Sequence, residues 1–505
     1  SSISTSGSAW VPVSIPTASQ PALSQAQLIA WEIVAGGAAV SVVAPSTGTP
    51  NKSYQVPPNL GASRTTASTG GTSPASLTPS QLGYGATLPF VCMSVSDIPP
   101  VYWPPNQKAF ESSGAATYTL PTTLLSGDLL DIAGIGGGGA AGWADGNYCN
   151  FLGIPYGTLN LGQGGEPGTW NAKTFVYGTD IPTSVTELGV FVGFGGNAPS
   201  GSGTKTIVGY NFTAPQFDAV SAGAQGHGTT LSWSHTAGAN TYVLVGLNTT
   251  WGTFNVTYGD ATMEPLGLVY LNNTGGVAAL ALYGLEDAPS GTSTITVTTA
   301  KAAYFTGGSI SFANVSCAGL VTDAYGNGTA LSQTVDCGSN QLVVQAFGNQ
   351  GYGQLGSFTG GTRRYYNYVP NGNYYSCGLS LSYATAPTTF AAASTVADSW
   401  GALSVVLNPS GTILFSADGG QAGGPGGTAN YNPASTNQST KGLGPGPGNK
   451  SWSGRLYVGG ASTAALAYPG NSPGGAASGG NRSTEPVGRG FAGGSGALYL
   501  TARQS

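Results

Sequence analysis

Residues 129–143 read LLDIAGIGGGGAAGW, and this stretch decides the fold. It starts as an apolar β pattern and passes directly into four consecutive glycines. The same order recurs at residues 189–196 (GVFVGFGG) and 412–420 (TILFSADGG), whereas residues 493–503 (GGSGALYLTAR) show it reversed. We therefore predict strands that deliver the chain into glycine-rich segments and receive it from them.

The whole chain is rich in glycine and poor in charge. It holds 83 glycines in 505 residues and only 7% charged residues, against averages of about 7% glycine and about 25% charged residues. Glycine segments offer few side chains for packing, so they persist only if their backbone N–H and C=O groups pair with neighbouring segments. The strict Gly-X-Y period of collagen is absent, which leaves irregular glycine-rich lobes and polyglycine bundles as alternatives.

Residues 210–408 have a different character from the rest of the chain. Short β patterns recur there about every 10 residues, which is typical of a sandwich. We predict a mainly β protein in which a jelly-roll-like β-sandwich, residues 210–408, is inserted into a split glycine-rich β domain, residues 108–209 and 409–505. Residues 1–107 predict an extended N-terminal attachment arm with one short helix, over residues 19–34, and a small polar linker.

Composition and motifs exclude several functions. The net charge is −5 and the cations are scattered apart from Arg363-Arg364, so the basic stripe of a nucleic-acid-binding protein is missing. Residues 134–139 match GxGxxG after a strand, but no helix pattern follows to hold a pyrophosphate. The five cysteines form no CxxC motif and predict buried free thiols, with one disulfide among Cys317, Cys337 and Cys377 as the alternative. The Asp, Asn and Gly clusters at residues 145–147, 260 and 323–327 are typical of turns, with a calcium site as the alternative. We expect no catalytic residue, no cofactor and no metal.

Histidines and carboxylates are the remaining candidates for chemistry. His227 and His235 show no metal-ligand or triad spacing, and His235 shares strand parity with Leu231 and Trp233, which predicts a position at the edge of a core. Glycoside hydrolysis needs only two carboxylates, so it remains an alternative. The acidic pool for it is Glu166, Glu187, Glu264, Glu286 and Asp287.

Residues 362–377, TRRYYNYVPNGNYYSC, are the densest aromatic segment. Asn371-Gly372 between two β patterns predicts a tight hairpin. Strict alternation places Arg363, Tyr365 and Asn367 on one face and Arg364, Tyr366 and Tyr368 on the other. One set of tyrosines is then exposed beside arginine, which suits sugars or a partner protein, whereas ordinary cross-strand pairs are the alternative. The candidate recognition residues are Arg363, Arg364, Tyr365, Tyr366, Tyr368, Tyr374 and Tyr375.

Several segments carry a resemblance to a known family. Residues 130–143, 468–475 (YPGNSPGG) and 496–503 (GALYLTAR) resemble the glycine-rich minor tail proteins of actinobacteriophages, of the mycobacteriophage type. Residues 217–223 (FDAVSAG) and 231–235 (LSWSH) look like the sandwich module of those proteins, and the resemblance extends from about residue 110 to the end. It implies a non-enzymatic structural protein of the virion tail, at the tail tip or fibre, that contributes to binding a host receptor.

The resemblance also implies partners. We expect the N-terminal arm to dock onto other phage tail proteins, a host cell-envelope glycan or glycolipid as the receptor, and a homo-oligomer, with a trimer as the candidate state. No nucleic acid and no membrane span are expected, since the longest apolar run, residues 28–44, is short and interrupted. Residues 1–3 lack a signal-peptide pattern, which predicts synthesis in the host cytoplasm. Two alternatives stay open: a cell-envelope-degrading glycoside hydrolase on a tail scaffold, and a purely structural or decoration protein of the particle.

Overall fold

A computed structural model of the chain shows two compact units, Ser1–Trp103 and Pro104–Ser505. It describes residues 2–5, 9–12, 40–42, 75–77, 107–141, 149–151, 154–156, 164–197, 201–250, 254–271, 278–351, 353–369, 376–423, 444–463, 468–478 and 491–503. Strands predominate and no helix occurs in these ranges, which confirms the mainly β fold class. No segment of the described part is a helix long and apolar enough to cross a membrane.

The first unit contributes two short strand pairs. β1 (Ser2–Thr5) pairs with β2 (Ala9–Pro12), and β3 (Val40–Val42) pairs with β4 (Ala75–Leu77), both antiparallel. The predicted helix over residues 19–34 and the predicted linker lie outside the described residues.

The second unit holds all other strands. Those flanking the glycine-rich segments are β5 (Gln107–Phe110), β6 (Gly114–Thr119), β7 (Leu129–Ile135), β8 (Cys149–Phe151), β9 (Ile154–Tyr156), β10 (Trp170–Val176), β11 (Glu187–Val192), β12 (Thr206–Thr213), β27 (Lys450–Trp452), β28 (Arg455–Tyr457) and β29 (Ala497–Arg503). Those of the central region are β13 (Gln216–Val220), β14 (Ala224–Ala237), β15 (Thr241–Thr249), β16 (Phe254–Tyr258), β17 (Ala261–Thr262), β18 (Glu264–Tyr270), β19 (Ala279–Ala288), β20 (Gly291–Ala313), β21 (Val315–Val335), β22 (Leu342–Gly351), β23 (Leu355–Thr359), β24 (Thr362–Val369), β25 (Ser376–Ala384) and β26 (Thr388–Ala417).

A small sandwich forms the base of the glycine-rich part. One layer is the sheet β10-β7-β29-β5, and the other is the end of the nine-stranded sheet, where β26, β12, β11 and β6 follow one another. Apolar side chains from both layers, including Ile132, Leu188, Val208 and Leu498, form one buried cluster. Alternating apolar residues in these strands therefore pack the two sheets against each other, and the glycine segments extend from the ends of the same strands.

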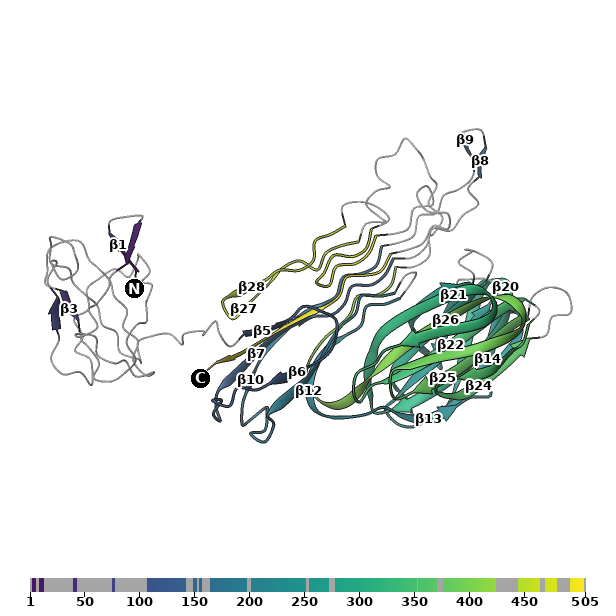
Figure 1. Cartoon of the computed structure of the whole chain (residues 1–505), viewed down its shortest axis with the longest axis horizontal. Helices are drawn as coiled ribbons and strands as arrows, with labels where there is room; N and C mark the ends of the chain where they lie inside the picture. The colour runs from purple at the N-terminus through teal and green to yellow at the C-terminus, as the bar shows by residue number, and fades with distance from the viewer. Residues whose placement is uncertain are drawn as a thin grey trace. The chain divides into compact units, whose positions relative to one another are not determined.

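The strands of this base continue into a bundle that we call the glycine lattice, drawn as near-parallel wavy segments in Figure 1. β7 and β26 lead into residues 136–141 and 418–423, β11 leads into residues 193–197, and residues 201–205 lead back into β12. Residues 164–169 lead into β10, and residues 491–496 lead into β29. Residues 470–478 complete the lattice. Strands entering and leaving glycine segments were predicted, and this arrangement confirms them.

Hydrogen bonds in the lattice follow a threefold pattern. Along residues 137–139, successive N–H groups donate to three different segments, through the carbonyls of Thr204, Gly494 and Glu166. Three residues later the first two of these segments are bonded again, by the N–H groups of Ala140 and Ala141. The carbonyls of residues 137–139 accept from three further segments, containing Gly420, Gly196 and Ala477. Along residues 137–141 the bonds run between segments with a period of three, which is the pattern of the polyproline II conformation, so this part of the bundle packs as a polyglycine helix among its neighbours.

The lattice has no room for side chains at its central positions. A Cβ added to Gly137 would lie 1.9 Å from the carbonyl oxygen of Phe194, and one added to Gly493 would lie 1.8 Å from that of Gly138. Any larger residue would force neighbouring backbones apart and break the hydrogen bonds between them. Of the two alternatives from the sequence, irregular lobes and polyglycine bundles, the structure shows the second.

The central region is a duplicated module, which the sequence analysis did not predict. We call strands β13 to β20, residues 216–313, module A, and strands β21 to β26 up to residue 409, module B. In module A, β15 pairs with β19 and β20, β16 pairs with β20, and β18 pairs with β19. In module B, β22 pairs with β25 and β26, β23 pairs with β26, and β24 pairs with β25. The two modules thus share one strand topology.

Local details repeat between the modules as well. Residues 226–232 (GHGTTLS) correspond to residues 326–332 (GNGTALS), and a register shift follows Gly228 in one module and Gly328 in the other. Asn240 and Asn340 both have a positive φ, 52° and 62°, at the turn before β15 and β22. The modules therefore share a sequence motif, a register shift and a positive φ at equivalent positions. We infer that they are copies of one unit.

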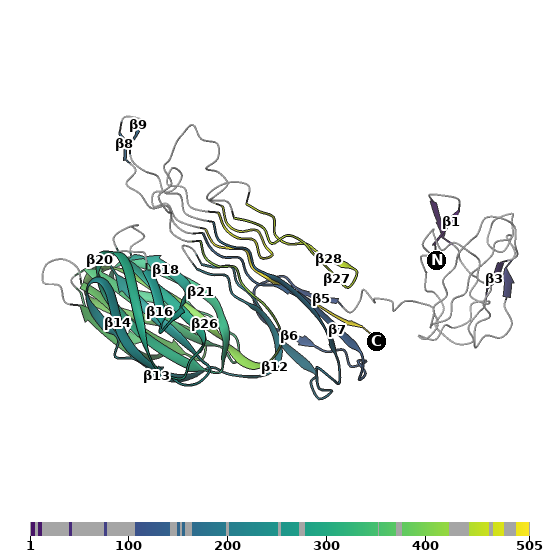
Figure 2. The ribbon, with the colours of Figure 1, turned by 180° about the vertical axis from the view of Figure 1, so that it is seen from behind.

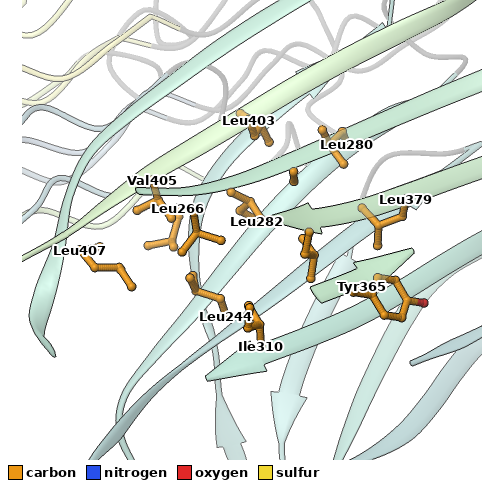
Figure 3. Packing of buried hydrophobic residues seen from close by; sticks show 14 of the residues in the cluster. Leu244, Leu266, Leu280, Leu282, Ile310, Tyr365, Leu379, Leu403, Val405 and Leu407 are labelled. Atoms are coloured by element: carbon orange, nitrogen blue, oxygen red, sulfur yellow. The ribbon is translucent and has the colours of Figure 1, made fainter. Parts of the chain in front are cut away.

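The modules pack face to face through a shared core, part of which appears in Figure 3. Leu244, Leu282 and Ile310 of module A meet Leu379 and Leu403 of module B there. Each module has a second cluster of its own on the other side of its sheet. Seen from behind in Figure 2, both modules form one layered body beside the lattice. The predicted domain boundaries at 209/210 and 408/409 stay predictions, and β12 and β26 run across them.

Candidate functional site

The predicted recognition hairpin exists. β24 and β25 pair antiparallel, with Val369 opposite Cys377, so the two strands form a hairpin, but this register is not that of the tight two-residue turn predicted at Asn371-Gly372. The turn, residues 370–375, lies outside the described residues, and with it the candidates Tyr374 and Tyr375.

A β-bulge changes which candidates share a face. Arg363 lies opposite Ser382 and Tyr365 lies opposite Leu381, so Arg364 is an extra residue in β24. The extra residue breaks strict alternation. Arg363 consequently lies over the ring of Tyr366, and Arg364 extends toward the side on which Tyr365 is buried. The predicted sets of faces were therefore wrong at this point.

Tyr365 belongs to the core and not to the surface. Its side chain is 5% exposed, and its hydroxyl donates to the carbonyl of Gly307 in module A over 2.7 Å. Burial raises the pKa of Tyr365 to about 12. Figure 3 shows its ring at the margin of the shared core. Tyr365 therefore joins the two modules and cannot contact a ligand.

Arg364 spans the two modules at the surface. Its guanidinium lies 4.0 Å above the ring of Phe217 in module A and 5.5 Å from that of Tyr383 in module B. Its Nη2 also donates to the Tyr383 hydroxyl over 3.1 Å. The rings of Phe217 and Tyr383 are parallel to within 3°, with centroids 5.8 Å apart. The exposed guanidinium is thus held in one orientation by two aromatic rings.

Arg363 is held in a similar way within module B. Its guanidinium lies 4.5 Å from the ring centroid of Phe358 and 5.8 Å from that of Tyr366. Tyr366 and Tyr368 are half-buried, and burial is the main cause that raises the pKa of Tyr366. Arg363 is exposed like Arg364. The candidate site therefore reduces to two ordered arginines with half-exposed aromatic rings beside them.

His235 lies inside module A within a chain of hydroxyl groups. Its Nδ1 is 2.9 Å from Ser309 Oγ and its Nε2 is 3.1 Å from Ser311 Oγ, which in turn donates to Asp218 over 2.6 Å. The side chain is 1% exposed, and burial lowers its pKa to about 4 although Asp218 acts in the opposite direction. His235 is a buried structural histidine, which bears out its predicted core position.

Two carboxylates of the hydrolase pool gather where the lattice meets module A. Lys205, at the end of a lattice segment, forms an ion pair with Glu286 of β19 and lies 4.0 Å from Asp418. Burial raises the pKa of both Glu286 and Glu264, and the nearby Lys205 opposes that rise. One lattice segment also bonds directly to β18, since the Ser202 N–H donates to the Pro265 carbonyl over 3.0 Å. The arrangement ties the two parts together.

Sequence reasoning missed this contact between lattice and module. Ser202 and Lys205 belong to one short segment that lies far in sequence from Glu264 and Glu286, and no spacing rule connects it to them. The low number of charged residues was a signal that could have found the contact. In a chain with so few charges, Lys205, Glu286 and Asp418 lie together where the lattice meets module A.

Comparison with known proteins gives one distant similarity. A stretch of 180 residues, 35% of the chain, is 27% identical to the Gene 32 protein of Mycobacterium phage D29 and covers 67% of that protein. No protein-family model matches the chain. The similarity shows that a phage protein is among the relatives of this chain.

Proposed function

We propose that the chain is a structural component of a phage tail, of the glycine-rich minor tail type, that contributes to host attachment. The observation that carries the proposal is the similarity to the mycobacteriophage protein. This similarity and the resemblance of residues 130–143 and 496–503 both point to mycobacteriophage proteins.

The glycine lattice supports this proposal physically. A bundle held by backbone hydrogen bonds between segments needs few side chains, and the strands of the base fix where each segment begins. Such a bundle would give stiff support to the modules beside it. An exposed part of a virion requires that kind of stiffness.

Partners follow from the same proposal. The first unit, Ser1–Trp103, would dock onto other tail proteins, and the second unit would contact a glycan or glycolipid of the host envelope. A homo-oligomer, with a trimer as the candidate state, and a location in the virion tail also belong to the proposal. We propose no enzymatic step, since Glu286 is held by Lys205 in a tie between lattice and module.

Competition for adsorption tests this function. Host cells are incubated with the purified full chain and then challenged with the phage that encodes it. We expect slower adsorption in proportion to the protein added, and unchanged adsorption with an unrelated β protein. Unchanged adsorption at saturating protein contradicts a role in attachment. Release of sugar from host wall polysaccharide by the same protein contradicts the non-enzymatic role.

A further inference from the structure

The duplication makes two edge strands comparable. β18 lies at the edge of the sheet of module A, and β24 lies at the edge of the sheet of module B. Each has an extra residue at the corresponding register shift, Leu266 in β18 and Arg364 in β24. The two bulges are therefore equivalent positions of one fold.

The two equivalent edges differ in what covers them. At β18 the carbonyl of Pro265 accepts from Ser202 of the lattice, and a Cβ on Gly201 would lie 2.6 Å from the carbonyl oxygen of Leu266. In the described part of the chain, β24 pairs with β25 and receives no such segment. The position that docks the lattice in module A is open in module B.

The open edge carries unpaired positive charge. Among the described residues, the ion pairs involve Lys205 and Arg503, and neither Arg363 nor Arg364 has a carboxylate within 4.0 Å. Both guanidinium groups lie against aromatic rings, which leaves N–H donors free to bind an oxyanion in a fixed orientation. In a protein with a net charge of −5, this edge attracts anions selectively.

We propose that the β24 edge binds an anionic polysaccharide, whose carboxylate or phosphate groups are held by Arg363 and Arg364. The choice of a polysaccharide as the ligand rests on the proposed function in host attachment. The two arginines contact rings on different sides of β24, so a polymer with repeated charges fits them better than a single small anion. Half-exposed Tyr366 and Tyr368 offer ring surface for sugar rings beside the charges.

The bulge favours a polysaccharide over an acidic protein strand. Strand addition needs a regular edge with evenly spaced N–H and C=O groups, and a bulge with charged side chains blocks such pairing. The two arginine side chains at this bulge oppose continuous strand pairing, so the edge is better suited to side-chain contacts with a sugar polymer.

Binding of the full chain to immobilised polygalacturonate tests the site, with neutral dextran and poly-L-glutamate as the other probes. We expect binding to polygalacturonate that weakens with added salt, and much weaker binding to both other polymers. The double variant Arg363→Gln, Arg364→Gln should bind at least about tenfold more weakly, because two charge-assisted contacts are lost. Lys173→Gln is the matched control, since Lys173 is also exposed and lies 4.7 Å from the ring centroid of Phe175.

Several results would overturn the inference. They are wild-type affinity in the double variant, an equal loss in Lys173→Gln, equally tight binding to dextran, and equally tight binding to poly-L-glutamate, which indicates an acidic protein partner. If the double variant does not fold, Arg363→Gln alone decides, because Arg363 lies against rings of module B only. A double variant that loses polygalacturonate but still slows adsorption refutes this site alone. A wild-type chain that binds polygalacturonate but leaves adsorption unchanged refutes the proposed function.

Discussion

At the scale of single residues, glycine in the lattice acts through the absence of a side chain. Gly137→Ala places a Cβ within 1.9 Å of a neighbouring carbonyl oxygen, so segments must separate. We expect a loss of about 3 kcal/mol in the free energy of unfolding, at the upper end of ordinary overpacking. Urea unfolding measures it.

Gly356→Ala is the control for this substitution. Gly356 has no atom within 4 Å of an added Cβ and no positive φ, so the change should leave stability within about 0.5 kcal/mol. Equal stability of the two variants would contradict the close packing of the lattice.

His235 predicts a pH dependence. Its pKa is about 4 in the folded protein against an ordinary 6.5, so the unfolded chain takes up a proton first as the pH falls. The stability contributed by neutral His235 is complete above pH 6.5 and is lost progressively down to about pH 4. The loss is on the order of 3 kcal/mol, since each pKa unit corresponds to about 1.4 kcal/mol.

The variant His235→Gln isolates this effect. It keeps a hydrogen-bonding side chain near Ser309 and Ser311 but does not titrate. Stability curves of wild type and variant should converge as the pH falls from 7 to 4. Parallel curves over that range would show that His235 is not buried in its neutral form.

Residue positions were predictable only where a local rule was sufficient. Strand parity with Leu231 and Trp233 placed His235 correctly. The same rule failed at Arg363 and Arg364, because a bulge is decided by pairing with β25 and not by the strand's own sequence. The sequence predicts Tyr365 as a surface candidate, because no local feature shows that module A provides the carbonyl of Gly307.

At the scale of elements, the ion pair of Lys205 and Glu286 joins a lattice segment to β19. Lys205→Met leaves the Glu286 carboxylate half-buried without its partner. We expect a loss of about 1 kcal/mol at pH 7, as for other partly exposed pairs. The loss should shrink in acid as Glu286, whose pKa is already raised, becomes neutral.

A double-mutant cycle with Glu286→Gln measures the pair itself. The coupling energy should be about 1 kcal/mol at low salt and smaller at high salt. A coupling of zero at both salt concentrations would mean that the backbone bond from Ser202 to Pro265 joins lattice and module without help from the ion pair.

Elements were partly predictable from sequence. Apolar runs that end in glycine correctly indicated strands feeding glycine segments, since both signals are local. The module duplication was visible in the repeated GxGTxLS of residues 226–232 and 326–332, but it needed comparison of the chain with itself. Which glycine segments become neighbours depends on the base sandwich and could not be predicted from any one segment.

At the scale of the whole molecule, the proposed role in a phage tail calls for stiffness and an exposed binding surface. The lattice, which is held mainly by backbone hydrogen bonds between segments, would provide the first, and the β24 edge with Arg363 and Arg364 would provide the second. Composition indicated this division, because glycine is concentrated outside residues 210–408 and the aromatic hairpin lies inside them.

Immunogold labelling of intact virions tests the central claim most directly. Antibodies against residues 210–408 are applied to the phage that encodes the chain, and adsorption of the labelled particles to host cells is then timed. The account predicts gold at the tail tip or fibres and slower adsorption of labelled particles. Particles that carry no gold, or gold away from the tail with unchanged adsorption, would contradict it.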